Sequence, residues 1–152
     1  MNKRVVILES IAPALYWAIL AASIWVLFRG HNEPGGGFIG GLIAVSASVL
    51  WAVAFSTSSA ERRLPFRSAV TLATIGIAVG TVSGIPALWL DNSYLTHIWG
   101  SIPWLGIKVS TVMVFDLGVY LAVWGALAGY ALSLLSLGED EEGGHPTEEG
   151  KA

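Results

Sequence analysis

Four long apolar blocks constrain the fold of this chain more than any other feature. Each block is long enough to cross a hydrocarbon core of about 30 Å at about 1.5 Å per residue, whereas buried segments of soluble proteins are shorter. With 54% of its 152 residues hydrophobic and only 12% charged, the composition is also unlike that of a soluble domain. We therefore predict an all-α, polytopic membrane protein whose transmembrane domain covers residues 1–137, with four transmembrane helices at residues 5–28, 37–55, 68–90 and 107–137.

Charge is distributed unevenly around these blocks. Six of the eleven acidic residues lie in segment 138–152, which we expect to be a disordered, solvated cytoplasmic tail. The first apolar run is too long for the hydrophobic region of a signal peptide, so we interpret it as a transmembrane helix. Because cytoplasmic loops are enriched in Lys and Arg, the distribution of cations predicts that both termini are cytoplasmic. Six cations fall on the side of the termini and two on the other: Lys3, Arg4, Arg62, Arg63, Arg67 and Lys151 against Arg29 and Lys108.

Small residues recur at helical spacing in every block. Lipid gives helices no hydrophobic reason to associate, so membrane helices pack where small residues let their backbones approach. Packing within one four-helix bundle explains some of these stripes. Stripes on all four blocks exceed what so small a bundle requires, which favours contacts with helices of neighbouring subunits. The glycines concerned are Gly76, Gly80 and Gly84 in the third block and Gly118, Gly125 and Gly129 in the fourth.

Asp116 is the ionisable residue deepest inside an apolar block, about nine residues or 13 Å from its start. A charge at that depth is costly unless it is paired, hydrated or protonated. At helical spacing Asp116 points roughly 200° away from Gly118, and in about the same direction as Tyr120 and Lys108. Asp116 is thus a candidate for an ion or proton pathway, or for a structural bond to a helix of another subunit. The second interpretation is favoured, because one carboxylate alone is not a relay.

The remaining ionisable residues form no catalytic or metal-binding pattern. Lys108 lies near the outer end of the fourth block, and Glu9 lies one turn into the first, where it is a candidate for proton entry. His31, His97 and His145 lie far apart without ligand spacing, and cysteine is absent. We therefore expect no metal site, no cofactor, no nucleic-acid partner and no enzymatic activity.

The segment between the first two blocks is rich in glycine. It reads Arg-Gly-His-Asn-Glu-Pro-Gly-Gly-Gly-Phe over residues 29–38. A phosphate-binding loop is excluded, because no Gly-Lys-Ser/Thr ending and no preceding strand are present. Pro34 ends extended structure and Gly35, Gly36 and Gly37 permit positive φ, so we predict a tight turn that leads into a helix at Phe38.

As a whole, this string resembles the hallmark of the B subunit of Mrp-type (Mnh) multi-subunit Na⁺/H⁺ antiporters. A second segment, Val-Phe-Asp-Leu-Gly-Val-Tyr at residues 114–120, is similar to the last-helix pattern of that family. The spacing of the two motifs and the four-helix plan also match. The resemblance covers residues 8–137 and leaves out the acidic tail.

This resemblance implies a role that the residues alone do not establish. Such subunits belong to hetero-oligomeric complexes in prokaryotic cell membranes, which exchange Na⁺ for H⁺ and in which larger subunits carry the main proton path. The expected partners are the other antiporter subunits and the lipid bilayer. The residues carried over would shape a subunit interface or an ion passage: His31, Pro34, Gly35, Gly36, Gly37, Phe38, Phe115, Asp116 and Gly118.

Two other functions remain open from the sequence. The chain could be the equivalent subunit of a membrane-bound hydrogenase or a related respiratory complex, in which redox chemistry in other subunits drives ion movement. It could also be a free-standing small transporter or a membrane scaffold. The neighbouring subunits would distinguish these alternatives.

Overall fold

The computed structural model of this protein describes residues 3–30, 35–85, 99–102 and 107–143. Apart from one short hairpin, the described elements are helical, which agrees in its main feature with the expected all-α fold. In chain order they are α1 (Lys3–Arg29), α2 (Gly37–Ala54), α3 (Thr57–Arg63), the 3-10 turn η1 (Pro65–Arg67), α4 (Ala69–Val82), β1 (Trp99–Ile102), β2 (Ile107–Ser110) and α6 (Thr111–Gly143).

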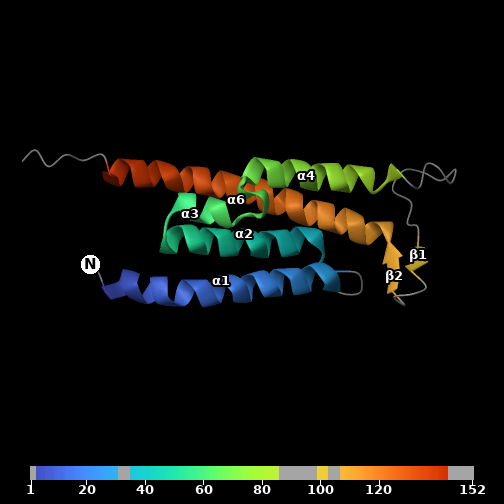
Figure 1. Ribbon diagram of the computed structural model, residues 1–152, viewed down its shortest axis with the longest axis horizontal. Helices are drawn as coiled ribbons and strands as arrows, with labels where there is room; N and C mark the ends of the chain where they lie inside the picture. Colours follow the sequence, from blue (N-terminus) through green and yellow to red (C-terminus); the bar gives the residue numbers. More distant parts are fainter. Residues whose placement is uncertain (1–2, 31–34, 86–98, 103–106, 144–152) are drawn as a thin grey trace, which may run out of the picture.

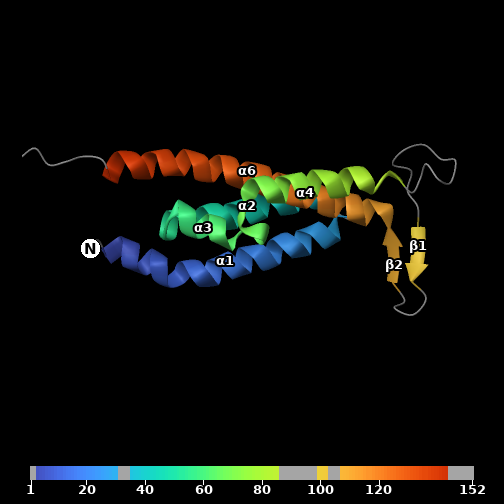
Figure 2. The ribbon, with the colours of Figure 1, turned by 45° about the horizontal axis from the view of Figure 1, so that its top comes forward.

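The four longer helices lie in a row. α2 packs between α1 and α6, and α4 packs against α6 on the side away from α2. Figure 1 shows that α1 and α4 run in one direction along the row and that α2 and α6 run in the other. The short helix α3 lies against α2 and α6, near the end where α1 begins (Figure 2).

Among the described residues, three helices are long and apolar enough to cross a membrane: Ile7–Arg29, Gly37–Ala54 and Thr111–Glu139. The shortest, α2, has 18 residues and therefore spans about 27 Å. These helices correspond to the first, second and fourth predicted blocks. α4 has only 14 residues, or about 21 Å, and the rest of the predicted block 68–90 lies largely outside the described residues. A fourth crossing therefore stays a prediction.

The boundaries of the last helix differ from the sequence expectation. Residues 107–110 were expected to begin a helix, but they form β2, which pairs antiparallel with β1 from Trp99↔Ser110 to Ile102↔Ile107. Two of its four residues are β-branched and apolar, a composition that fits a paired strand. At the other end, α6 continues through the first six residues of the expected tail to Gly143, and three of these six residues are Glu, a good helix former. Residues 144–152 lie outside the described part.

The segment between α2 and α4, which separates the second and third predicted blocks, holds a short helix and a sharp kink. The hydroxyl of Ser56 accepts a hydrogen bond from the Ser59 backbone N–H at 3.2 Å, and so caps α3. Ser68 caps α4 in the same way through Thr71 N–H at 3.3 Å. Between the two helices, Phe66 has the positive φ of 62° that turns the chain.

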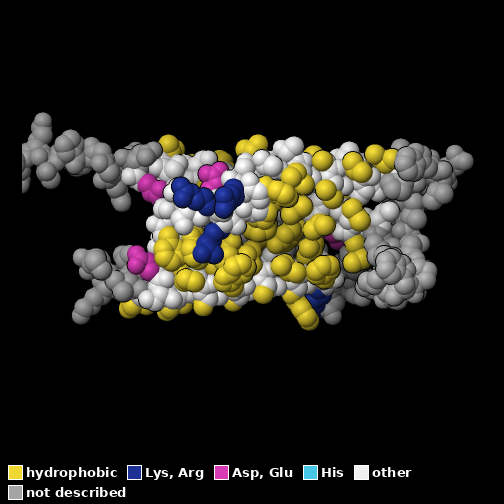
Figure 3. Space-filling model, viewed as in Figure 1, with side chains coloured by type: hydrophobic (Ala, Val, Ile, Leu, Met, Phe, Trp, Pro, Cys, Tyr) yellow, Lys and Arg dark blue, Asp and Glu magenta, His cyan; other side chains and the backbone are white. Residues whose placement is uncertain are grey.

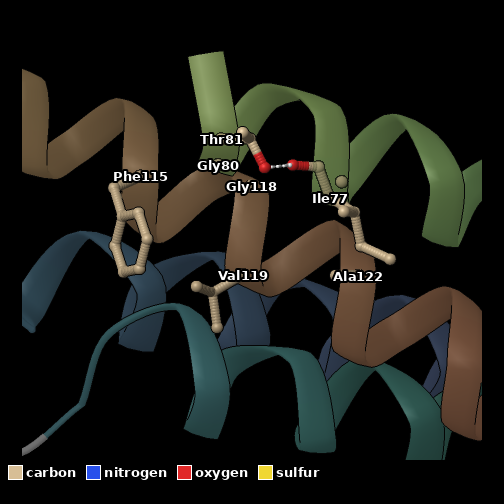
Figure 4. Close-up of a pocket in the computed structure, with 8 residues that line it drawn as sticks. Ile77, Gly80, Thr81, Phe115, Gly118, Val119 and Ala122 are labelled. Atoms are coloured by element: carbon tan, nitrogen blue, oxygen red, sulfur yellow. Dashed lines mark hydrogen bonds between the residues drawn. The ribbon is translucent and has the colours of Figure 1, made fainter. Parts of the chain in front are cut away.

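Glycines on α4 and α6 bring these two helices into backbone contact. A Cβ atom on Gly118 would overlap the backbone nitrogen of Gly80, and one on Gly76 would overlap that of Ala122. Figure 4 shows this crossing, with Gly80 of α4 beside Gly118 of α6. A Cβ on Gly125 would likewise overlap the backbone nitrogen of Ala73. The glycine stripes of these helices are therefore used inside this chain, and they are no evidence for a neighbouring subunit.

The two remaining glycines of these stripes make looser contacts. A Cβ on Gly129 would lie 2.8 Å from the Cβ of Ala69. Gly84 lies in a turn beyond the last residue of α4. Its backbone N–H donates to the Thr81 carbonyl at 3.4 Å. Only two glycines of the third block therefore belong to the helical stripe.

The outer surface of the row is largely apolar. Figure 3 shows hydrophobic side chains spread over one face of all the long helices. Trp25 is 70% exposed and Val70 is 76% exposed. Exposed apolar surface of this extent is suited to lipid or to neighbouring membrane helices.

Candidate functional site

Gly36 and Gly37, called the glycine turn below, pack directly on α6. Gly36 has φ 93° and ψ −168°, and its N–H donates to the carbonyl of Val26 at 3.1 Å, which ties the turn to α1. A Cβ on Gly37 would overlap the carbonyl oxygen of Asp116 and would lie 3.0 Å from the backbone nitrogen of Tyr120. The two motifs singled out in the sequence, 29–38 and 114–120, therefore meet in space.

The carboxylate of Asp116 lies beside the N-terminus of α2. A Cβ on Gly36, the residue before the helix, would be 3.5 Å from Asp116 Oδ2. The first intrahelical bond of α2 runs from Gly40 N–H to the Gly36 carbonyl, so the N–H groups before Gly40 have no partner within the helix. No side chain caps this end of α2. The positive end of the helix dipole therefore lies beside the Asp116 carboxylate.

Asp116 is half-buried in apolar surroundings. The other residues that line the cavity beside it are Leu27, Phe28, Met113, Val114 and Leu117. No hydrogen bond or ion pair within the described part of the chain engages its carboxylate. A carboxylate with apolar walls needs a cation, a proton or a donor. None of the described residues supplies such a partner for Asp116.

One turn further along α6, Tyr120 makes a buried bond to α1. Its hydroxyl oxygen lies 2.6 Å from that of Ser23. Gly40 of α2 makes room for the pair, because a Cβ there would lie 3.0 Å from the Ser23 carbonyl and 3.2 Å from the Tyr120 ring. The sequence made Tyr120 a candidate pathway residue. In the structure, its hydroxyl is bonded to that of Ser23, which gives it a structural role instead of an open position.

Trp124 continues the same face of α6. Its indole N–H donates to the hydroxyl of Ser48 at 2.9 Å, and that hydroxyl donates to the Ala44 carbonyl at 3.2 Å. Asp116, Tyr120 and Trp124 thus form a polar column at four-residue spacing. Sequence reasoning missed Ser23 and Trp124, and it gave Ser48 no hydrogen-bonding role. The serines within apolar blocks are the only sequence signal that could have indicated them.

The predicted opposite directions of Asp116 and Gly118 agree with the structure, but the predicted alignment with Lys108 does not, because Lys108 lies in β2 and not on α6. Asp116 faces α2, whereas Gly118 faces α4. Phe38 is exposed, and Phe115 lies at the rim of a groove between α4 and α6 (Figure 4). Thr81, on the opposite wall of that groove, donates its hydroxyl to the Ile77 carbonyl at 2.9 Å.

The other candidate residues are not brought to this site. Glu9 is exposed near the beginning of α1, about 30 Å along the helix from the end that contacts the glycine turn. Lys108 pairs with Ser101 in the hairpin. His31 and Pro34 lie outside the described residues. Within the described ranges, no three His, Cys, Asp or Glu side chains are grouped so that they could hold a metal ion.

Comparison with known proteins identifies close relatives of this chain. A family model described as "domain related to MnhB subunit of Na+/H+ antiporter" matches residues 7–129. The Na(+)/H(+) antiporter B subunit of Alkalihalophilus pseudofirmus is 36% identical over 140 residues, which are 90% of this chain and 94% of the relative. The putative antiporter subunit mnhB2 of Staphylococcus aureus strain Newman is 34% identical over 137 residues, which are 88% of this chain and 96% of that protein.

A solved structure shares the fold. A chain in the structure of the Mrp complex from Dietzia sp. DQ12-45-1b matches with a TM-score of 0.73 and 31% sequence identity. The match covers 88% of this chain but only 14% of that chain. The shared unit is thus a small part of a much longer polypeptide in that complex.

Proposed function

Because this chain belongs to the family of domains related to the MnhB subunit of the Na⁺/H⁺ antiporter, we propose that it is a membrane subunit of a multi-subunit, Mrp-type cation/proton antiporter. Its relatives with 34–36% identity are antiporter subunits by name and are matched over nearly their whole length. Neither name describes an enzyme, which supports a transport role for this chain.

The observation that carries the proposal is the contact between the glycine turn and Asp116. Gly37 leaves no room for a side chain above the Asp116 carbonyl, and the Asp116 carboxylate lies at the positive end of α2 with no partner among the described residues. A carboxylate placed in this way can accept a cation or a proton, or can pair with a basic residue of a neighbouring subunit. We assign it to the cation/proton exchange of the complex, and the test below separates this role from an interface role.

The membrane setting is a further part of the proposal. Three helices are long and apolar enough to cross the membrane, and we propose a fourth crossing that includes α4. The beginning of α1, α3 and the end of α6 lie toward one end of the row (Figure 1). Arg62, Arg63 and Arg67 lie in this region, which by the positive-inside rule supports cytoplasmic termini. The membrane would be that of a prokaryotic cell.

The test is Asp116→Asn in the assembled complex, with Na⁺-dependent proton exchange measured in everted vesicles and complex abundance measured in parallel. Loss of exchange with normal abundance supports the exchange role, because the amide keeps the shape and removes the titratable charge. Loss of the complex itself assigns Asp116 to an interface. Normal exchange and normal abundance would refute both roles.

Identification of the co-purifying chains tests the wider proposal. Antiporter subunits are the expected companions. Nickel–iron or iron–sulfur subunits would instead assign this chain to a hydrogenase-like respiratory complex, and an active homo-oligomer would assign it to a free-standing transporter.

A further inference from the structure

Three arginines gather on the kinked segment between α2 and α4. Arg62 and Arg63 end α3, and Arg67 ends η1. All three are exposed. Figure 3 shows Lys and Arg side chains clustered on this part of the surface, next to the apolar faces of the long helices.

Arg63 is held in place by aromatic rings from two other helices. Its guanidinium carbon lies 3.6 Å from the ring centroid of Trp51 and 5.6 Å from that of Tyr16. Both rings are buried and meet edge to face at 5.3 Å. The Trp51 indole N–H donates to the hydroxyl of Ser59 at 3.0 Å, which fixes the ring under the guanidinium. A guanidinium stacked in this way keeps the N–H groups at its edge free for an acceptor.

Arg67 is positioned by the backbone of the kink, whereas Arg63 is positioned by aromatic rings. Phe66 and Arg67 have φ values of 62° and 53°, which are uncommon for residues with a side chain. The turn is closed by a bond from Arg67 N–H to the Leu64 carbonyl at 2.9 Å, and the Leu64 side chain is buried. Phe66 is 62% exposed. The strained turn therefore places a large apolar side chain next to a cation on the outer surface.

The described part of the chain does not neutralise the three positive charges. Within the described residues, no ion pair engages Arg62, Arg63 or Arg67. Glu61 also forms none. Glu139 directs both carboxylate oxygens to Thr57, one to its backbone N–H at 3.1 Å and one to its hydroxyl at 2.7 Å. The arginine cluster therefore offers charge and donors to an external anion.

The position of the cluster indicates which anion. The 18-residue apolar helix α2 ends at Ala54, three residues before α3 begins, so α3 and η1 lie where hydrocarbon gives way to headgroups. Phosphate groups of lipids are the anions found at this level, and guanidinium groups bind them through paired hydrogen bonds. We propose that Arg62, Arg63 and Arg67 bind the headgroup of an anionic phospholipid, with Phe66 beside its acyl chain.

The test uses the full-length chain purified in non-ionic detergent with its companion subunits, and measures thermal unfolding with added lipid. Phosphatidylglycerol should raise the Tm by at least about 4 °C more than the same amount of phosphatidylcholine. Equal shifts from the two lipids would overturn the proposal. An equal shift from inorganic phosphate alone would also overturn it, because the site would then bind free anions and not a lipid.

Variants identify the residues. The triple variant Arg62→Gln, Arg63→Gln and Arg67→Gln should abolish the difference between the two lipids, whereas Arg29→Gln, at the other end of α1, should keep it. If the triple variant does not fold, Arg62→Gln and Arg67→Gln are examined singly, and each should lower the number of phosphatidylglycerol molecules retained in native mass spectrometry. Retention equal to that of the unmodified protein in both would refute the assignment.

Discussion

The hydroxyl oxygens of Tyr120 and Ser23 lie 2.6 Å apart, although 97 residues separate them in the chain. Both side chains are buried, and the bond joins α6 to α1 past Gly40 of α2. A single hydrogen bond thus fixes the two helices on either side of α2 relative to each other.

Ser23→Ala should destabilise the protein, because it leaves the buried Tyr120 hydroxyl without its partner. We expect a loss of about 1–3 kcal/mol in the free energy of unfolding, measured by denaturant titration in detergent. Tyr120→Phe should cost less, since a helical serine can bond to a preceding carbonyl instead. Adding Ser23→Ala to Tyr120→Phe should then have little further effect. Fully additive losses would show that the two hydroxyls do not interact.

Gly37→Ala should disturb the contact between the glycine turn and α6. The new Cβ would overlap the Asp116 carbonyl oxygen, and backbone atoms of two packed helices cannot move apart without opening their interface. We expect a loss of about 1–3 kcal/mol in unfolding free energy and less assembled complex in the membrane. The control is Gly138→Ala, because a Cβ there meets nothing within 4 Å. Similar abundance of the two variants would contradict the contact.

The crossing of α4 and α6 provides a matched pair of substitutions. Gly118→Ala places a Cβ into the backbone of Gly80, whereas Gly80→Ala places one in the groove, 4.0 Å from the Phe115 ring. The first should therefore lower the Tm by several degrees and the second should change the unfolding free energy by no more than about 0.5 kcal/mol. Thermal scans of both variants decide the matter. A larger effect for Gly80→Ala would show that the helices cross differently.

Glu139→Ala should free the end of α6 from α3. The carboxylate is exposed, so we expect a loss below about 1 kcal/mol in global stability. Amide hydrogen exchange over residues 136–143 should nevertheless become faster, because the bonds to Thr57 are lost. Glu61→Ala serves as the control, since its carboxylate makes no such bonds, and it should leave exchange in this segment unchanged. Unaltered exchange in the Glu139 variant would mean that these bonds do not hold the helix end.

Apolar length and glycine spacing predicted a large part of this architecture. Three helices long and apolar enough to cross a membrane, and the opposite directions of Asp116 and Gly118, follow from hydropathy and helical geometry alone. The partner of each glycine could not be predicted, because small residues indicate that a helix will be approached closely but not by which helix. The sequence left open which glycines pack within the chain and which meet neighbouring subunits, and the structure shows that Gly76 and Gly118 each contact the other's helix within this chain.

Features that depend on chain reversal were missed for a different reason. Arg63 lies over Trp51 only because α3 folds back against the end of α2. The seven residues of α3 contain no pattern that predicts this reversal of the chain. The hairpin was missed because strands of four residues are shorter than any reliable hydropathy pattern. At the candidate site, the family resemblance indicated both motifs but not that they meet, and Ser23 became visible only through its distance to Tyr120.

The arrangement of α1, α2, α6 and α4 in a row has a consequence for assembly. A closed bundle hides its middle helices, but a single row of helices leaves parts of both of its broad sides exposed, apart from the region of α2 and α6 that α3 covers. Such a row of helices can contact different neighbouring subunits on its two sides at once. A displacement of a helix caused by a subunit on one side would then reach the subunit on the other side across one layer of helices.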